Sequence, residues 1–119
     1  MQAMRVNVAG VDVHQEVLAI TVLLGGGVDE TPKQIQFTSN TFTEDLIKAG
    51  QKLLELGVKE VAMESTGVYW KPLWHVWKPM AIKITVGQAA NIKNVPGRKT
   101  DMNDSQWIAE LHRYGLIKP

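Results

Sequence analysis

The chain has 119 residues, of which 45% are hydrophobic, and its formal net charge is +1 at pH 7. This size and composition predict one folded domain and exclude a disordered chain. There is no cysteine, which excludes disulfides and thiolate metal sites. No apolar run reaches the ~18 residues of a membrane span, so we expect a cytoplasmic protein without membrane contact.

The first half of the chain predicts three strands followed by a helix. Alternating or β-branched residues indicate strands over residues 5–13, 17–24 and 33–38. Thr41 and Glu44 stand at the spacing of a capping box. The apolar pattern after them predicts a helix that stops at Gly57.

In the second half, strands and helices alternate. We expect a strand, an aromatic-rich helix, a strand, a polar loop and a final helix over residues 59–63, 69–78, 82–86, 87–100 and 101–114. Three antiparallel strands followed by alternating helices and strands predict an α/β fold. Its core would be a mixed five-stranded sheet with flanking helices.

Two carboxylates stand at the ends of predicted strands. Asp12 lies within the apolar run 8–13, and Glu64 follows the apolar run 61–63. A charged side chain there costs several kcal/mol if it is buried without a partner. Taken alone, each residue is better explained as a carboxylate at a solvated strand end or in a turn than as part of an active site.

Two further carboxylates, Asp101 and Asp104, stand three residues apart at the predicted start of the last helix. That spacing predicts one shared helical face, although an Asp in a first turn also simply stabilises the helix dipole. Brought together with Asp12 and Glu64, they would repel one another unless a cation lay between them. Hard oxygen ligands favour Mg²⁺ or Mn²⁺, and a pair of such ions supports phosphodiester cleavage.

Three sequence blocks carry a family resemblance: residues 10–16 (GVDVHQE), 63–70 (MESTGVYW) and 94–107 (NVPGRKTDMNDSQW). In this order they resemble the N-terminal domain of the insertion-sequence 110 transposases, relatives of the pilin-gene invertase, over nearly the whole chain. The resemblance implies a ribonuclease-H-like fold similar to that of the RuvC Holliday-junction resolvase. It also places the family's DEDD tetrad, as catalytic residues and metal ligands, on Asp12, Glu64, Asp101 and Asp104.

The resemblance implies the function of a mobile-element recombinase, which is metal-dependent cleavage and transfer of DNA strands. The implied cofactor is Mg²⁺ or Mn²⁺. The implied partners are DNA and, in the full-length protein, a guide RNA from the element and further copies of the same chain. The family also carries a C-terminal domain with a serine nucleophile, which residues 1–119 lack. We therefore expect a single RuvC-like catalytic domain.

Basic and aromatic residues near these blocks are candidates for nucleic-acid contact. Lys93, Arg98 and Lys99 crowd a segment that contains glycine and proline, where they can meet backbone phosphates; a solvated loop is the alternative. Tyr69 is the aromatic residue that we expect near solvent. The helical spacing of the tryptophans after it favours packing in the core over stacking on bases: Trp70, Trp74 and Trp77.

Two other functions fit parts of the sequence. The chain could be an inactive nucleic-acid-binding module, or a truncated fragment that retains only the fold. A sugar-kinase or actin-like ATPase domain also begins with a strand that ends in Asp. The absence of a further glycine-rich phosphate loop and the short chain disfavour this ATPase reading.

Overall fold

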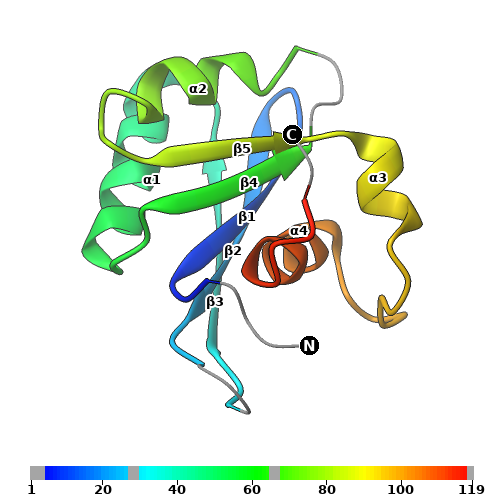
Figure 1. Ribbon diagram of the computed structural model, residues 1–119. Helices are drawn as coiled ribbons and strands as arrows, with labels where there is room; N and C mark the ends of the chain where they lie inside the picture. The colour runs from blue at the N-terminus through cyan, green and yellow to red at the C-terminus, as the bar shows by residue number, and fades with distance from the viewer. Residues whose placement is uncertain (1–4, 27–29, 65–67, 118–119) are drawn as a thin grey trace.

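A mixed five-stranded sheet forms the centre of the molecule, and the computed structural model describes residues 5–26, 30–64 and 68–117 (Figure 1). The strand order is β3-β2-β1-β4-β5. β2 pairs antiparallel with both β1 and β3, whereas β4 pairs parallel with both β1 and β5. The strands are β1 (Val8–Val13), β2 (Val17–Leu24), β3 (Lys33–Asn40), β4 (Glu60–Glu64) and β5 (Lys83–Gly87). The predicted mixed sheet with an antiparallel start is confirmed.

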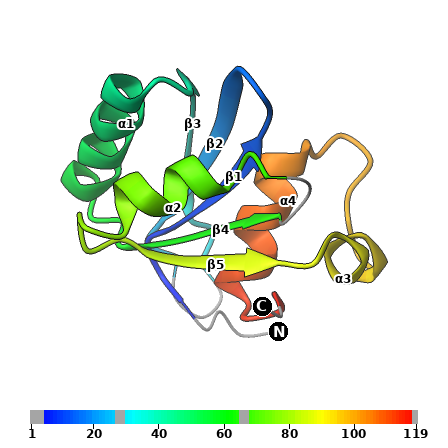
Figure 2. The same ribbon diagram turned by 90° about the horizontal axis from the view of Figure 1, so that it is seen from above.

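Helices cover both faces of this sheet. They are α1 (Thr43–Glu55), α2 (Lys71–Trp77), α3 (Ala89–Asn94) and α4 (Asp104–Arg113). α1 and α2 lie on one side, and α4 packs on the other side against β1, β2 and β4 (Figure 2). Within the described ranges, no helix combines the length and the apolar content that a membrane crossing needs.

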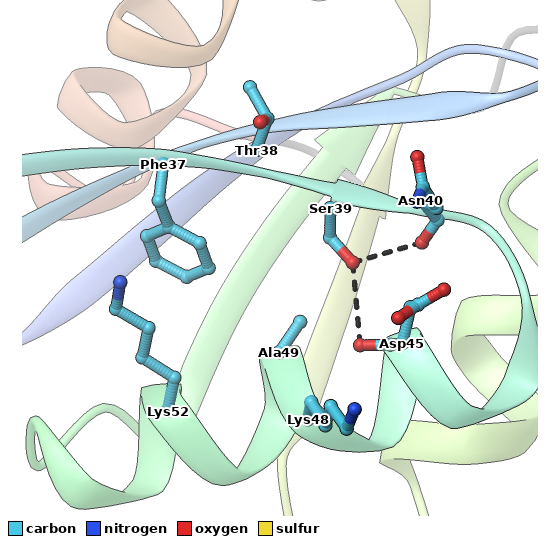
Figure 3. Close-up of a pocket in the computed structure, with 8 residues that line it drawn as sticks. All are labelled: Phe37, Thr38, Ser39, Asn40, Asp45, Lys48, Ala49 and Lys52. Carbon is cyan, nitrogen blue, oxygen red and sulfur yellow. Dashed lines mark hydrogen bonds between the residues drawn. The ribbon is translucent and has the colours of Figure 1, made fainter.

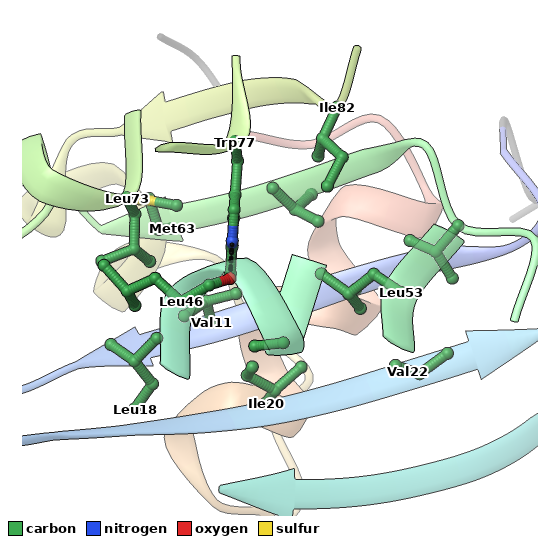
Figure 4. Close-up of a cluster of buried hydrophobic side chains, with 14 residues drawn as sticks. Val11, Leu18, Ile20, Val22, Leu46, Leu53, Met63, Leu73, Trp77 and Ile82 are labelled. Atoms are coloured by element: carbon green, nitrogen blue, oxygen red, sulfur yellow. Dashed lines mark hydrogen bonds between the residues drawn. The ribbon is translucent and has the colours of Figure 1, made fainter. Parts of the chain in front are cut away.

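The larger core lies between the sheet and the pair α1 and α2 (Figure 4). Alternate residues of β1 and β2 point into it, including Val11, Leu18 and Ile20. Trp77 is fully buried there, and its indole Nε1 donates a hydrogen bond to the backbone oxygen of Leu46 at 2.8 Å. The expectation that the tryptophans of α2 fill the core is right for Trp77.

The other two tryptophans of this region correct that expectation. Trp70 and Trp74 are only partly buried, and their rings meet edge to face with the centroids 6.1 Å apart. The reason is the shortness of α2, which is a 7-residue helix at the edge of the sheet. One face of so short a helix buries Leu73 and Trp77 and leaves the neighbouring side chains at the surface.

Two predicted helix starts are also wrong. Thr41 does not cap α1: its hydroxyl donates to the backbone oxygen of Gln15 at 3.0 Å, and the N-cap is Phe42. α4 begins at Asp104 rather than at Asp101. A capping box formed by Asn103 and Gln106 fixes that start, since the Asn103 side chain accepts from the Gln106 amide at 2.9 Å.

Because α4 starts later than predicted, Asp101 and Asp104 do not share a helical face. Asp101 lies in the turn before the helix and is exposed. The segment predicted as one polar loop is likewise interrupted, because residues 89–94 form α3. Ile92 anchors α3 by packing against the residues of α4 that face it.

Gly10 sets how closely α4 approaches β1. A Cβ atom on Gly10 would lie 2.2 Å from the backbone nitrogen of Ala109 and 2.4 Å from the backbone oxygen of Ser105. Both are atoms of the helix backbone, so no side-chain rotation could make room. The close contact of helix and sheet therefore depends on the missing side chain.

The C-terminal end of α4 is buried with two titratable residues. His112 is 2% exposed and Arg113 4% exposed. Arg5 donates to the backbone oxygen of His112 at 3.1 Å, and Arg113 donates to the backbone oxygens of Gly26 and Glu30. Burial, together with the positive charges of Arg5 and Lys83, lowers the pKa of His112 to about 4. His112 is therefore neutral at pH 7.

We predict that Gly10→Ala lowers the free energy of unfolding by about 1–3 kcal/mol or more, as overpacking does. Gly50→Ala is the matched control. A Cβ there meets the flexible end of Met80 (Cε at 2.8 Å) and the ring of Trp77 (Cδ1 at 3.0 Å), which are side-chain rather than backbone atoms, and alanine is favoured over glycine inside a helix. Denaturant unfolding of both variants measures the difference. Equal stability of Gly10→Ala and the wild type would contradict the close contact.

Candidate active site

Asp12 and Glu64 lie side by side at the carboxyl ends of neighbouring parallel strands. The β1–β4 register pairs Val11 with Met63, so Asp12 and Glu64 occupy the next position along the two strands. Side chains alternate along a strand, which places both carboxylates on the face where Gly10 meets α4. The register thus brings the ends of these two strands together.

Asp104 reaches the same face as the first residue of α4. A chain of side-chain hydrogen bonds ties this end of the helix to the sheet. Ser105 donates to the Asn103 side chain at 2.9 Å, so its hydroxyl accepts from Thr21 at 2.8 Å. Gln36 in turn donates to the Thr21 hydroxyl at 3.2 Å. Two strands thus hold the turn that carries Asp104.

The pKa of Asp12 depends on its burial and on three charged neighbours. Burial raises the pKa of Asp12, the nearby His14 opposes this shift, and the negative charges of Asp104 and Glu64 raise the pKa further. The side chain of Asp12 is 21% exposed. A cation between these carboxylates would replace their repulsion by attraction, so the donor set fits a hard divalent ion in its chemistry.

His14 lies beside this group, as its spacing from Asp12 predicts. Its Nε2 is 3.0 Å from Oδ2 of Asp12, and its own side chain is 59% exposed. The imidazole therefore holds one oxygen of Asp12 in place and leaves the other oxygen for other partners.

Arg98 binds Asp104 directly. Its Nη2 donates to Oδ1 of Asp104 and to the backbone oxygen of Met102, both at 2.8 Å. Lys99 follows in the same exposed segment, and Lys93 is exposed on α3. Of the three basic candidates, Arg98 is the one that the structure places in contact with a predicted acidic residue.

Asp101 stands apart from this arrangement. The charged groups that shift the pKa of Asp12 are His14, Asp104 and Glu64, and Asp101 lies in an exposed turn before α4. Over residues 5–26, 30–64 and 68–117, no three Asp, Glu or His side chains are close enough together to hold one metal ion. The structure therefore places Asp12, Glu64 and Asp104 where the charges of the other two act on Asp12. Among the described residues, these carboxylates are not close enough together to hold one metal ion.

The polar groove between β3 and α1 is a separate feature (Figure 3). It holds about 340 Å³ and contains none of the four predicted acidic residues. Its polar groups bind within the chain: Ser39 donates to the backbone oxygen of Asp45 at 3.3 Å, and the Lys52 ammonium lies 4.2 Å from the centre of the Phe37 ring. This groove is not a candidate active site.

Comparison with known proteins identifies the family. The model of the DEDD transposases of insertion sequence 110, described as transposase, matches residues 9–119. The chain belongs to this transposase family. The match argues against the ATPase hypothesis and agrees with the resemblance carried by the three sequence blocks. No curated protein matches the sequence significantly.

Solved structures show which fold this transposase domain has. It is similar to T. thermophilus RuvC, solved in complex with a Holliday junction substrate, with a TM-score of 0.61 and 14% identity over 97% of this chain and 99% of RuvC. It is also similar to the Fowlpox virus resolvase, solved with Holliday junction DNA, with a TM-score of 0.53 and 14% identity over 78% of this chain and 67% of the resolvase. The fold of the transposase domain is thus the ribonuclease-H-like, RuvC-like fold that was expected.

Sequence reasoning missed the residues that position Asp104. Thr21, Asn103 and Ser105 are polar residues without an obvious catalytic role, and Thr21 and Ser105 are buried. The available signal was the pair Asn103 and Gln106, whose spacing is that of a capping box. Its presence would have moved the predicted start of the last helix to Asp104.

We predict that Asp12→Asn leaves the metal-free domain equally stable or more stable at pH 7. The fold raises the pKa of Asp12, so the charged form costs stability above that pKa, and the cost disappears as the pH falls through it. Asparagine avoids the charge and still accepts from His14. Thermal melts at several pH values should show a gain that shrinks in acid.

Asp101→Asn is the control for this variant, since Asp101 is exposed in the turn before α4. Its melting temperature should follow that of the wild type at each pH. A melting temperature of Asp12→Asn below that of the wild type at neutral pH would mean that the ion pair with His14 outweighs burial and repulsion.

Proposed function

We propose that residues 1–119 form the catalytic domain of a mobile-element DNA recombinase, which cleaves and transfers DNA strands with a divalent metal. The observation that carries the proposal is the convergence of Asp12, Glu64 and Asp104 from two parallel strand ends and one helix start. Burial and the neighbouring carboxylates raise the pKa of Asp12, and carboxyl groups with raised pKa values are frequent in catalytic sites. Membership of the transposase family supplies the reaction class.

The metal ligands in this proposal are the tetrad Asp12, Glu64, Asp101 and Asp104, with Mg²⁺ or Mn²⁺ as the ion. When bound, the ion supplies charge neutralisation at a phosphodiester and an activated water or hydroxyl. His14 keeps Asp12 oriented through the contact at 3.0 Å. Asp104 would join this set by exchanging Arg98 for the ion, and Asp101 would join it only if the turn before α4 moved.

Arg98 and Lys99 would then hold the DNA backbone. A guanidinium released from Asp104 can bind a phosphate with two parallel hydrogen bonds, beside the bond to be cleaved. Lys93 adds a phosphate contact from α3, and Tyr69, with 45% exposure, adds a contact to a base. A DNA phosphate would thus take the place of Asp104 as the partner of Arg98.

In the full-length protein, we propose that a guide RNA directs this domain to its target and that several copies act together. The serine nucleophile of the family would come from a C-terminal domain outside residues 1–119. These proposals rest on family membership.

The ion pair between Arg98 and Asp104 favours a second candidate function. An arginine that occupies a predicted metal ligand at 2.8 Å is also what a nucleic-acid-binding module without catalytic activity would contain. Such a module would bind DNA through its basic segment and would not respond to divalent metal.

Metal dependence separates these two functions. Added Mg²⁺ or Mn²⁺ should raise the melting temperature of the wild type by mass action and support nicking of a four-way DNA junction. Asp12→Asn and Asp104→Asn should lose both responses. Asp45→Asn, which removes a carboxylate in the β3–α1 groove, should keep both. A wild type that shows no metal-dependent shift would leave the binding module as the function.

The basic segment predicts a salt effect of its own. Arg98→Ala combined with Lys99→Ala should weaken DNA binding, and the slope of log K against log salt should fall by about one for each residue removed. Lys48→Ala combined with Lys52→Ala removes the same charge from the β3–α1 groove and should leave binding unchanged. Equal slopes for both double variants would refute the phosphate role.

A further inference from the structure

A second surface of the domain combines exposed aromatic rings with positive charge. It is the groove between α2 and β5, called here the tryptophan groove, and it is lined by Trp70, Lys71, Trp74, Lys83, Ile84 and Val86 together with His75 and Thr85. Its volume is about 690 Å³, within the range of ~300–1,000 Å³ that ligand pockets span. Figures 1 and 2 show α2 beside β5, the strand at the edge of the sheet.

The aromatic rings of this groove are held in place without being fully buried in the core. Trp70 packs partly against the larger core, and the ring of Trp74 meets the ring of Trp70 edge to face. Both side chains keep part of their surface outside the core. Ile84 and Val86 form the apolar wall opposite them. Flat rings that are fixed and accessible are the platform on which unpaired bases stack.

The charges around these rings are positive. Lys71 and Lys83 line the groove, and no acidic residue is among its described lining residues. The Lys78 ammonium lies 5.0 Å from the centre of the Trp74 ring. A cation directly beside an aromatic face matches a nucleotide, in which the phosphate follows the base. The surface therefore complements a polyanion that carries flat apolar groups.

The position of the groove connects it to the candidate active site. Val86 lines the groove, and the next residue, Gly87, pairs with Glu64 across β4 and β5. One end of the groove thus lies near the carboxyl ends of β4 and β5. Val86 faces the core under α1 and α2, whereas Asp12 and Glu64 lie on the face that α4 covers. A strand that follows β5 to its carboxyl end would therefore reach these carboxylates by passing around the end of the sheet.

A second copy of the chain suits this groove less well. Symmetric dimers bring the same patch of both subunits together, which would set Lys71 and Lys83 of one copy near the same lysines of the other. Like charges at close range oppose such an interface. A negatively charged partner does not meet this obstacle.

We propose that the tryptophan groove binds an unpaired segment of the DNA substrate, with bases stacked on Trp70 and Trp74 and with phosphates held by Lys71 and Lys83. The proposal deepens the proposed function and rests on it, because the bound strand would lead to the carboxylates that cleave it. It assigns a role in holding single strands to residues outside the acidic tetrad.

Tryptophan fluorescence tests the proposal without cleavage. The other two tryptophans, Trp77 and Trp107, are 0% and 6% exposed, so quenching by an oligonucleotide reports on Trp70 and Trp74. In EDTA, a short oligothymidylate should quench the wild type and bind more tightly than duplex DNA or oligouridylate. Trp70→Leu combined with Trp74→Leu should abolish the quenching and weaken binding about tenfold or more.

A second pair of variants keeps the test decisive if the leucine variant folds poorly. Lys71→Ala combined with Lys83→Ala retains both rings and should weaken oligothymidylate binding and its salt dependence. Lys48→Ala combined with Lys52→Ala, in the polar groove between β3 and α1, is matched in charge and should change neither. Equal effects of the two lysine pairs, or binding without quenching, would overturn the proposal.

The remaining outcomes also decide. Tighter binding of oligouridylate would make RNA the occupant and overturn the assignment to DNA. Sedimentation of a dimer that the leucine variant dissociates would make a second copy the occupant. Asp12→Asn should quench as the wild type does. A wild type that is quenched but shows no metal response would refute the proposed function alone, and a wild type that responds to metal but is not quenched would refute the groove alone.

Discussion

The contact between α4 and β1 at Gly10 is the constraint on which the rest of the structure depends. The strands bring Asp12 and Glu64 together through their register, but Asp104 belongs to a helix that is distant in sequence. Its place is set where the backbone of Ser105 and Ala109 meets a residue without a side chain. The hydrogen bond between Thr21 and Ser105 then fixes the rotation of the helix. Packing thus determines the electrostatics of the site.

This arrangement brings negatively charged side chains together, although their repulsion opposes folding. The charge of Asp104 is stabilised by the positive end of the α4 dipole and by Arg98, and the charge of Asp12 is stabilised by His14. These partners are at the surface and can exchange for other groups. The buried contacts that hold the N-terminal end of the helix, in contrast, are neutral hydrogen bonds and apolar packing. The contacts that hold the helix in place and the charged contacts that can be exchanged are therefore made by different residues, only a few positions apart.

The sequence was sufficient for the order of strands and helices along the chain and for a mixed sheet, because alternation and apolar runs depend on short spacings. It was insufficient for the start of α4, since an Asp at 101 and an Asn at 103 are both good caps and only the second finds its partner in Gln106. Trp70 and Trp74 were misplaced for a related reason. Helical spacing gives a face but not the length of the helix that presents it, nor what covers it.

The buried imidazole of His112 gives the domain a limit on its acid side. In the unfolded chain this group takes up a proton near pH 6.5, whereas in the fold it resists protonation down to about 4. Between these pH values the chain takes up one proton when it unfolds. The free energy of unfolding therefore falls by about 1.4 kcal/mol for each unit by which the pH is lowered. Because His112 lies in the last turn of the helix that begins with Asp104, acid would weaken the packing of α4 at its C-terminal end.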